Sequence, residues 1–178
     1  MNSVQKIIQF GHPTLRQVSA EVSLDYISSS EIQDLAASLR KTLPDHGIGL
    51  AAPQINHPWR MFLADLSKST RADESEGSSI CINPKITKFS SDNETDWEGC
   101  LSAPGIWGQV TRPESIIVAF YDEFGKSQSA KLSGVAARVF QHELDHLDGI
   151  LFVDRMTDMT TLVTDEEFDK IHEKVRKS

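Results

Sequence analysis

The chain has 178 residues, of which 39% are hydrophobic and 25% are charged. These values are typical of a single globular domain, here residues 1–178, that buries a core of ordinary size. The formal net charge of −8 argues against a DNA-binding protein, which needs a basic face for the phosphate backbone.

Cysteine content and hydrophobic runs indicate the compartment. Cys81 and Cys100 are the two cysteines, fewer than a secreted domain of this size usually carries, which indicates a reducing cytoplasmic environment. Residues 1–10, MNSVQKIIQF, lack the apolar core of a signal peptide. Since no apolar run approaches the roughly 20 residues of a membrane-spanning helix, we expect a cytoplasmic protein without membrane association.

The first predicted element is a helix over residues 30–43. Ser30 and Gln33 fit a capping box at its start. Hydrophobic residues recur on one face of this segment, at Ile32, Leu35, Ala36, Leu39 and Leu43. Pro44 follows and ends the helix.

Predicted strands occupy the middle of the chain. Residues 61–66 and 80–86 have the composition of strands, and the polar run 69–79 between them predicts a loop. Residues 86–132 are β-like throughout, and SIIVAFY at 115–121 is the strongest strand pattern among them.

A helical pattern returns from Gly134 to about Leu147, with Ser133 as a possible N-cap and Gly149 in a possible C-terminal stop. A last helix is predicted at about 165–176. Strands followed by late helices indicate an α+β fold. We expect antiparallel β-sheets packed around the central helix, with an N-terminal helix and a C-terminal helix.

The central helix carries QHELDHLDG at 141–149. His142 and His146, four residues apart, lie on one face of a helix, which suits two imidazoles that bind one metal ion. Glu143 is turned away from their shared direction and can reach a metal-activated water as a general base. The alternative for such a segment is a solvated helix rich in histidine and acidic residues.

A third ligand is needed. Phe152 stands where metzincin proteases have their third histidine, which excludes that class. Glu166 lies at the distance typical of thermolysin-like enzymes, but acidic residues also suit the first turn of a helix. Cys100, in EGCLS, offers a thiolate that suits zinc or ferrous iron and leaves a position open for water. Cys81 is interpreted as a small buried hydrophobe.

Three motifs together resemble the signature motifs of the peptide deformylases. They are GIGLAAPQ at 47–54, EGCLS at 98–102 and QHELDHLDG at 141–149, and their order and spacing also fit. The resemblance implies a hydrolase of protein biosynthesis that removes the N-formyl group from the N-terminal formyl-methionine of new polypeptides and releases formate. It also implies one divalent metal ion per chain, physiologically Fe²⁺, with Zn²⁺, Ni²⁺ or Co²⁺ able to occupy the site.

The resemblance also implies residue roles. The metal ligands would be Cys100, His142 and His146. Glu143 would be the general acid and base when water on the metal attacks the formyl carbon. Gln54 and the backbone N–H of Leu101 would stabilise the oxyanion that forms.

Substrate contacts are predicted for a further set of residues, namely Ile48, Gly49, Glu98, Gly105 and Val139. Ile48, Leu101 and Val139 fit a methionine pocket and fit the hydrophobic core equally well. Arg138 departs from the aliphatic residue that many bacterial deformylases have at the pocket wall, so a different pocket shape is expected.

The C-terminal end, KIHEKVRKS, concentrates basic residues in an acidic protein. These cations either complement the C-terminus of a helix or contact the ribosome near the exit tunnel. Two alternative functions stay open: a metalloprotease with Glu166 as third ligand, and a non-catalytic metal-binding or ribosome-associated module. Glu143 and Gln54 argue against such a module, because metal storage needs neither.

Overall fold

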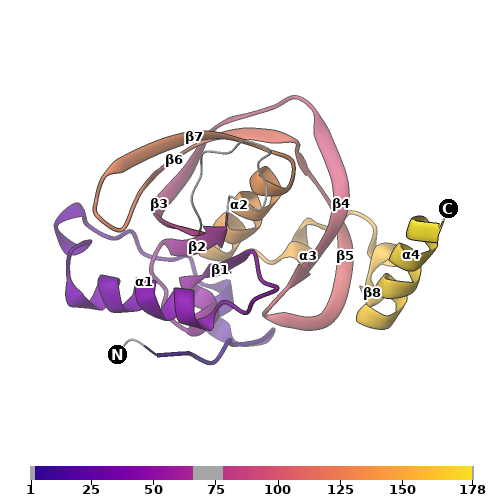
Figure 1. Cartoon of the computed structure of the whole chain (residues 1–178), viewed down its shortest axis with the longest axis horizontal. Helices are drawn as coiled ribbons and strands as arrows, with labels where there is room; N and C mark the ends of the chain where they lie inside the picture. Colours follow the sequence, from indigo (N-terminus) through magenta and orange to yellow (C-terminus); the bar gives the residue numbers. More distant parts are fainter. Residues whose placement is uncertain (1–2, 66–77, 178) are drawn as a thin grey trace.

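The computed structural model describes residues 3–65 and 78–177, with side chains for 3–65 and 79–173. Figure 1 shows the longest helix, α2, in the centre of the molecule, with sheets around it and α1 and α4 at opposite ends. The helices are α1 (Ser30–Thr42), α2 (Gly134–Leu147), α3 (Phe152–Arg155) and α4 (Asp165–Lys177). The strands are β1 (Gly49–Ala51), β2 (Met61–Asp65), β3 (Ser78–Phe89), β4 (Asn93–Cys100), β5 (Ala103–Pro113), β6 (Ser115–Tyr121), β7 (Ser127–Ser133) and β8 (Val163–Thr164).

The larger sheet has five strands in the order β1-β2-β3-β6-β7 and lies between two helices. All residues of β2 are buried, because successive side chains of a strand point to opposite faces and here both faces are covered. Met61 and Leu63 join the core beneath α1. Phe62 and Ala64 join the core beneath α2, where the Phe62 ring meets the edge of Phe140 at a centroid distance of 5.0 Å.

The smaller sheet has three strands in the order β4-β5-β8. Strands β4 and β5 are antiparallel, and Cys100 pairs with Ala103, so Leu101 and Ser102 form the tight turn between them. Phe152 of α3 packs with Val110 of β5 in a third hydrophobic cluster. The smaller sheet and the larger one therefore enclose α2, and the turn brings Cys100 close to that helix.

The α+β class and the antiparallel sheets around a central helix are confirmed. The central helix begins at Gly134 and ends at Leu147 as predicted. The N-cap of α1 was predicted one residue too late. Ser29 rather than Ser30 is the cap, and its hydroxyl accepts a hydrogen bond from the Ile32 amide. Either serine can cap a helix, so the sequence alone did not separate them.

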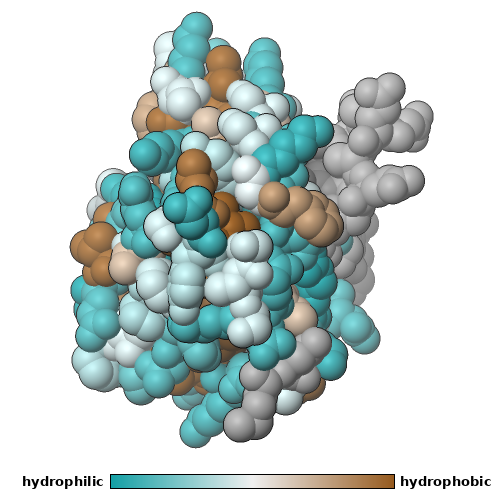
Figure 2. All heavy atoms as spheres, turned by 90° about the vertical axis from the view of Figure 1, so that its left-hand side faces the viewer, coloured by the Kyte–Doolittle hydropathy of each residue, from teal (hydrophilic) through white to brown (hydrophobic). Residues whose placement is uncertain are grey.

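The predicted loop at 69–79 lies largely outside the described residues, and its last two serines belong to β3. The strand predicted at 80–86 is longer than expected and extends to Phe89. In the described ranges, the helices lack the length and hydrophobicity of a membrane span. On the face seen in Figure 2, hydrophobic residues occur singly or in small groups among hydrophilic ones.

Candidate metal centre

Cys100, His142 and His146 come together as one group of possible metal ligands. One ligand atom from each residue lies within 4.8 Å of the other two. The Cys100 Sγ atom is 3.2 Å from Nε2 of His146. Tetrahedral zinc with ordinary bond lengths would separate a sulfur and a nitrogen ligand by roughly 3.5 Å. The spacing of the three side chains therefore fits a single metal ion.

Each of the two histidines has one ring nitrogen that is available to bind a metal ion. Nδ1 of His142 lies 2.9 Å from Oε2 of Glu98 and must donate, because an ionised carboxylate only accepts. This contact leaves Nε2 of His142 for a metal. Burial lowers the pKa of His146 well below its ordinary value, which keeps the ring neutral, as metal binding demands.

Glu98 fixes the orientation of the His142 ring. Its carboxylate accepts hydrogen bonds from Nε and Nη2 of Arg112, at 2.6 and 3.0 Å, and from Nη1 of Arg138, at 2.9 Å. Burial alone would raise the pKa of Glu98, but hydrogen bonds from His142 and Arg112 outweigh it and hold the pKa well below its usual range. Glu98 therefore stays ionised and fixes the His142 ring.

The support extends through Asp145, which the sequence marks as a candidate for a supporting or surface role, and through three arginines to which the sequence assigns no such role: Arg112, Arg138 and Arg155. Arg112 also donates to Asp145 at 2.8 Å, and Arg155 donates to the same carboxylate at 2.6 Å. Arg138 donates in addition to the backbone oxygens of Val110 and Glu94, each at 2.8 Å. One signal was available, since Asp145 stands between the histidines in the helix motif, but its arginine partners are distant in sequence.

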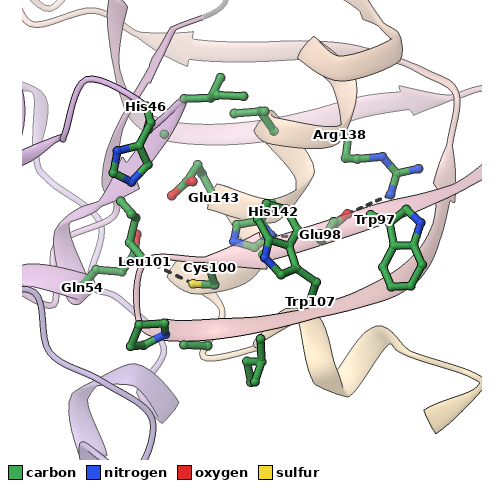
Figure 3. Close-up of a pocket in the computed structure, with 18 of the residues that line it drawn as sticks. His46, Gln54, Trp97, Glu98, Cys100, Leu101, Trp107, Arg138, His142 and Glu143 are labelled. Atoms are coloured by element: carbon green, nitrogen blue, oxygen red, sulfur yellow. Dashed lines mark hydrogen bonds and ion pairs between the residues drawn. The ribbon is translucent and has the colours of Figure 1, made fainter. Parts of the chain in front are cut away.

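Glu143 is buried beside the ligand group (Figure 3) and is 4% exposed. Its Oε2 atom has no hydrogen-bond partner among the described residues. Burial raises the pKa of Glu143 to about 7, and a nearby cation would lower it again. A Cβ atom on Gly49 would lie 2.8 Å from both Cγ and Cδ of Glu143. Only glycine at this position leaves room for the carboxylate.

Gln54 is the other predicted catalytic side chain, and its amide has a fixed orientation. The side-chain oxygen accepts a hydrogen bond from the Ala51 amide at 2.7 Å. Nε2 therefore points toward Ser102 Oγ, at 3.2 Å, and toward Cys100 Sγ, at 3.6 Å. The amide N–H group thus faces the ligand group from the side of the β4–β5 turn, as Figure 3 shows.

These groups face a pocket of about 450 Å³. All five predicted substrate-contact residues line it, namely Ile48, Gly49, Glu98, Gly105 and Val139, and so does the predicted oxyanion residue Leu101. Val139 and Leu101 also pack against the hydrophobic clusters, so their positions are compatible with either role that the sequence allowed. Residues at the outer end, which the sequence did not predict, are Asp96, Trp97, Trp107 and Asp165.

The alternative third ligand is not at the site. The Glu166 side chain is 80% exposed and pairs with Lys170 on the same helix, at 2.8 Å. Cys81 is fully buried in the core beneath α2, and burial raises the pKa of its thiol. It is a structural residue, as predicted from the sequence.

Comparison with known proteins identifies relatives over most of the chain. Residues 4–161 match the family model described as Polypeptide deformylase. Peptide deformylase 2 of Nostoc sp. is 41% identical over 169 residues, which cover 93% of each chain. The peptide deformylase of Desulforudis audaxviator is 40% identical, over 87% of this chain and 95% of its own.

Solved structures show the same fold. A class I type b peptide deformylase from Acinetobacter baumannii, crystallised with Met-Ala-Ser bound, has a TM-score of 0.78 and 32% identity, over 88% of this chain and all of its own. A probable peptide deformylase from Synechococcus phage S-SSM7 has a TM-score of 0.72 and 42% identity, over 85% of this chain and 99% of its own.

Proposed function

The chain belongs to the polypeptide deformylase family, and we propose that the residues around the Cys100, His142 and His146 group carry out its reaction. The reaction is the metal-dependent removal of the N-formyl group from new polypeptides. One observation supports this assignment above the others. A buried carboxylate and an oriented amide, from Glu143 and Gln54, flank a group of three possible ligands at one end of the pocket.

Cys100, His142 and His146 would hold the metal ion through Sγ and two imidazole nitrogens. When bound, a divalent ion lowers the pKa of water and polarises a carbonyl oxygen. A thiolate with two imidazoles suits zinc or ferrous iron. We propose Fe²⁺ as the physiological ion, with Zn²⁺, Ni²⁺ or Co²⁺ as substitutes. The fixed His142 ring and the buried His146 ring give a ligand set that needs little rearrangement.

Glu143 transfers a proton from the attacking water to the departing amine. Its carboxylate is beside His142 and faces the pocket, where it can accept the proton of the attacking water. The same oxygen then donates that proton to the departing amine as the C–N bond of the formamide breaks. Formate and a free N-terminal amine result.

Gln54 and Leu101 act on the negative charge that develops on the formyl oxygen. The Gln54 amide is fixed in advance by the Ala51 N–H. Leu101 follows Cys100 in the tight turn, and its backbone N–H is the second donor that we propose. Donors that are in place before charge develops stabilise a transition state without reorganisation.

The remaining pocket residues divide between binding and support. We propose that Ile48, Gly49, Gly105 and Val139 contact the substrate. Glu98 was also predicted to contact it, but donors from the protein surround both of its oxygens. We therefore propose that Glu98 acts on His142 rather than on the substrate.

The test is formate release from formyl-Met peptides by protein loaded anaerobically with iron. Peptide-bond cleavage is measured in the same samples. We expect stoichiometric formate and intact internal peptide bonds. Cleavage of internal bonds without formate would replace this proposal by the metalloprotease alternative, although the position of Glu166 does not favour that enzyme.

We further propose that the chain folds as one domain, acts in the cytoplasm and meets its substrates as they emerge from the ribosome. The side chains of Lys174, Arg176 and Lys177 lie outside the described residues. Lys170 pairs with Glu166 and Glu167 at 2.8 Å and is the only described member of that basic group. Cosedimentation with ribosomes, compared between the whole chain and one that ends at residue 173, tests the contact.

A further inference from the structure

The outer end of the pocket is built by four residues from three elements, which we call the outer wall: Asp96, Trp97, Trp107 and Asp165. Asp96 and Trp97 belong to β4, Trp107 belongs to β5, and Asp165 begins α4. Figure 3 shows Trp97 on the side of His142 that is opposite Glu143 and Gln54, and Trp107 overlaps His142 in this view. The wall and the ligand group line the same pocket, so a peptide whose formyl group lies at the metal centre can reach the wall with its following residues.

The C-terminal helix is fixed to the wall by aromatic contacts. The Phe168 ring stacks on Trp107 with a centroid distance of 4.1 Å and an interplanar angle of 9°. The same ring meets Trp97 at 5.5 Å and 79°. On its other side, the Trp107 indole lies against Gly99, where a Cβ atom would be 3.0–3.1 Å from three ring atoms. Phe168 thus holds α4 against Trp107, and Trp107 in turn packs on Gly99, the residue that precedes the proposed ligand Cys100.

Asp165 is oriented by the same contacts. Its Oδ1 atom accepts a hydrogen bond from Trp107 Nε1 at 2.6 Å. Its Oδ2 atom lies 3.7 Å from the position that a Cβ on Gly105 would occupy, and Gly105 lines the pocket. One carboxylate oxygen of Asp165 is thus bound to Trp107, and the other lies near Gly105, which lines the pocket together with Asp165.

Charge at the outer wall is negative. Asp96 and Asp165 are exposed carboxylates. Among the described residues that line the pocket, Arg138 is the only lysine or arginine. Its guanidinium group already donates to Glu98 and to two backbone oxygens. Two carboxylates favour a cation here through Coulomb attraction. Both faces of Trp107 are covered, by Phe168 and by Gly99, so Trp97 is the indole that can add a cation–π contact.

We infer that the outer wall selects formyl-methionyl peptides with a lysine or arginine at the second or third residue. This inference rests on the proposed function, because it assigns the specificity of the same pocket. The C-terminal helix, through Asp165, then becomes part of the substrate site.

The test compares kcat/KM for formate release from formyl-Met-Ala-X and formyl-Met-X-Ala, where X is Lys, Gln or Glu. We expect Lys to exceed Glu by about tenfold at low salt in at least one series, since each exposed carboxylate contributes roughly threefold. The ratio should decrease in 0.5 M NaCl, because salt screens exposed charges.

Asp165→Asn and Asp96→Asn should each lower the Lys-to-Glu ratio about threefold, and the double variant should abolish the preference. Asp96 lies on β4, so its variant tests the charge even if Asp165→Asn loosens α4. The matched control is Asp169→Asn, an exposed carboxylate of α4 outside the pocket, which should leave the ratio unchanged.

Equal kcat/KM for the Lys, Gln and Glu peptides would overturn this inference alone, as would a double variant that keeps the wild-type ratio. Absence of formate from every peptide would overturn the proposed function as well.

Discussion

Glu98→Gln tests whether the Glu98 carboxylate stabilises the protein and orients His142. The substitution keeps the shape of the side chain and one oxygen, so the contacts at Oε1 can persist as weaker hydrogen bonds. The other oxygen becomes an NH₂ group that faces two donors, Arg112 Nη2 and His142 Nδ1. Arg112 keeps Asp145, and Arg138 keeps two backbone oxygens.

The magnitude follows from the burial of these charges. Loss of one partner from a buried ion pair costs about 3–5 kcal/mol. The remaining partners of both arginines place Glu98→Gln near the lower limit, about 3 kcal/mol in the free energy of unfolding. With a urea dependence of about 2 kcal/mol/M, the midpoint should decrease by roughly 1.5 M. Removal of the carboxylate that orients a metal-binding histidine should also weaken metal affinity by about 10–100-fold.

Urea unfolding of the metal-free protein measures the first effect, and zinc titration against a chromogenic chelator measures the second. Glu94→Gln is the matched control, since Glu94 lies on the same strand with an exposed side chain and only its backbone oxygen contacts Arg138. If Glu98→Gln matched Glu94→Gln in both measurements, the assignment of Glu98 as the residue that orients His142 would be refuted.

Four further predictions concern the same site. Because the pKa of Glu98 is depressed in the folded state, its stabilisation is complete above the unfolded-state pKa of about 4.3 and is lost at lower pH. The stability difference between wild type and Glu98→Gln should therefore narrow from pH 6 to pH 3 in urea unfolding. Cys100→Ser should lose bound metal by elemental analysis, whereas Cys81→Ser should retain it; equal metal contents would exclude Cys100 as a ligand. Gln54→Ala should lower kcat by about 10²–10³-fold at unchanged metal content, and an unchanged kcat would remove Gln54 from the oxyanion site. Gly49→Ala should displace Glu143 and lower kcat at least tenfold, which a steady-state assay on iron-loaded protein would detect.

The sequence was sufficient for features that depend on local spacing. His142 and His146 are one helical turn apart, so a correct helix prediction places both on one face. The helix limits at Gly134 and Leu147 were predictable because a glycine at each end and a hydrophobic repeat between them mark this segment. Cys100 was a candidate ligand from its sequence context, and the resemblance of three motifs favoured this role over that of a core residue, which is the commoner role of a lone cysteine on a strand.

The contacts that the sequence did not predict depend on how separate strands and helices pair and pack. Arg112 reaches Glu98 because β4 and β5 pair so that Glu98 lies opposite Gly108. A register shift between Gly99 and Cys100, next to the turn, sets this pairing, and no sequence pattern predicted that shift. The close approach of Gly49 to Glu143 likewise depends on how β1 packs against α2. Phe168 contacts both tryptophans only because α4 returns to the β4–β5 hairpin. The pattern of α4 predicted a helix but not the surface that it covers.

Formate release by Glu143→Gln, compared with wild type, tests the central claim most directly when each protein carries one equivalent of iron. Wild type should release formate from formyl-Met-Ala-Ser, and Glu143→Gln should bind the same amount of iron and release almost none. An equal rate for the variant at equal iron content would contradict the assignment of Glu143 as the residue that moves the proton.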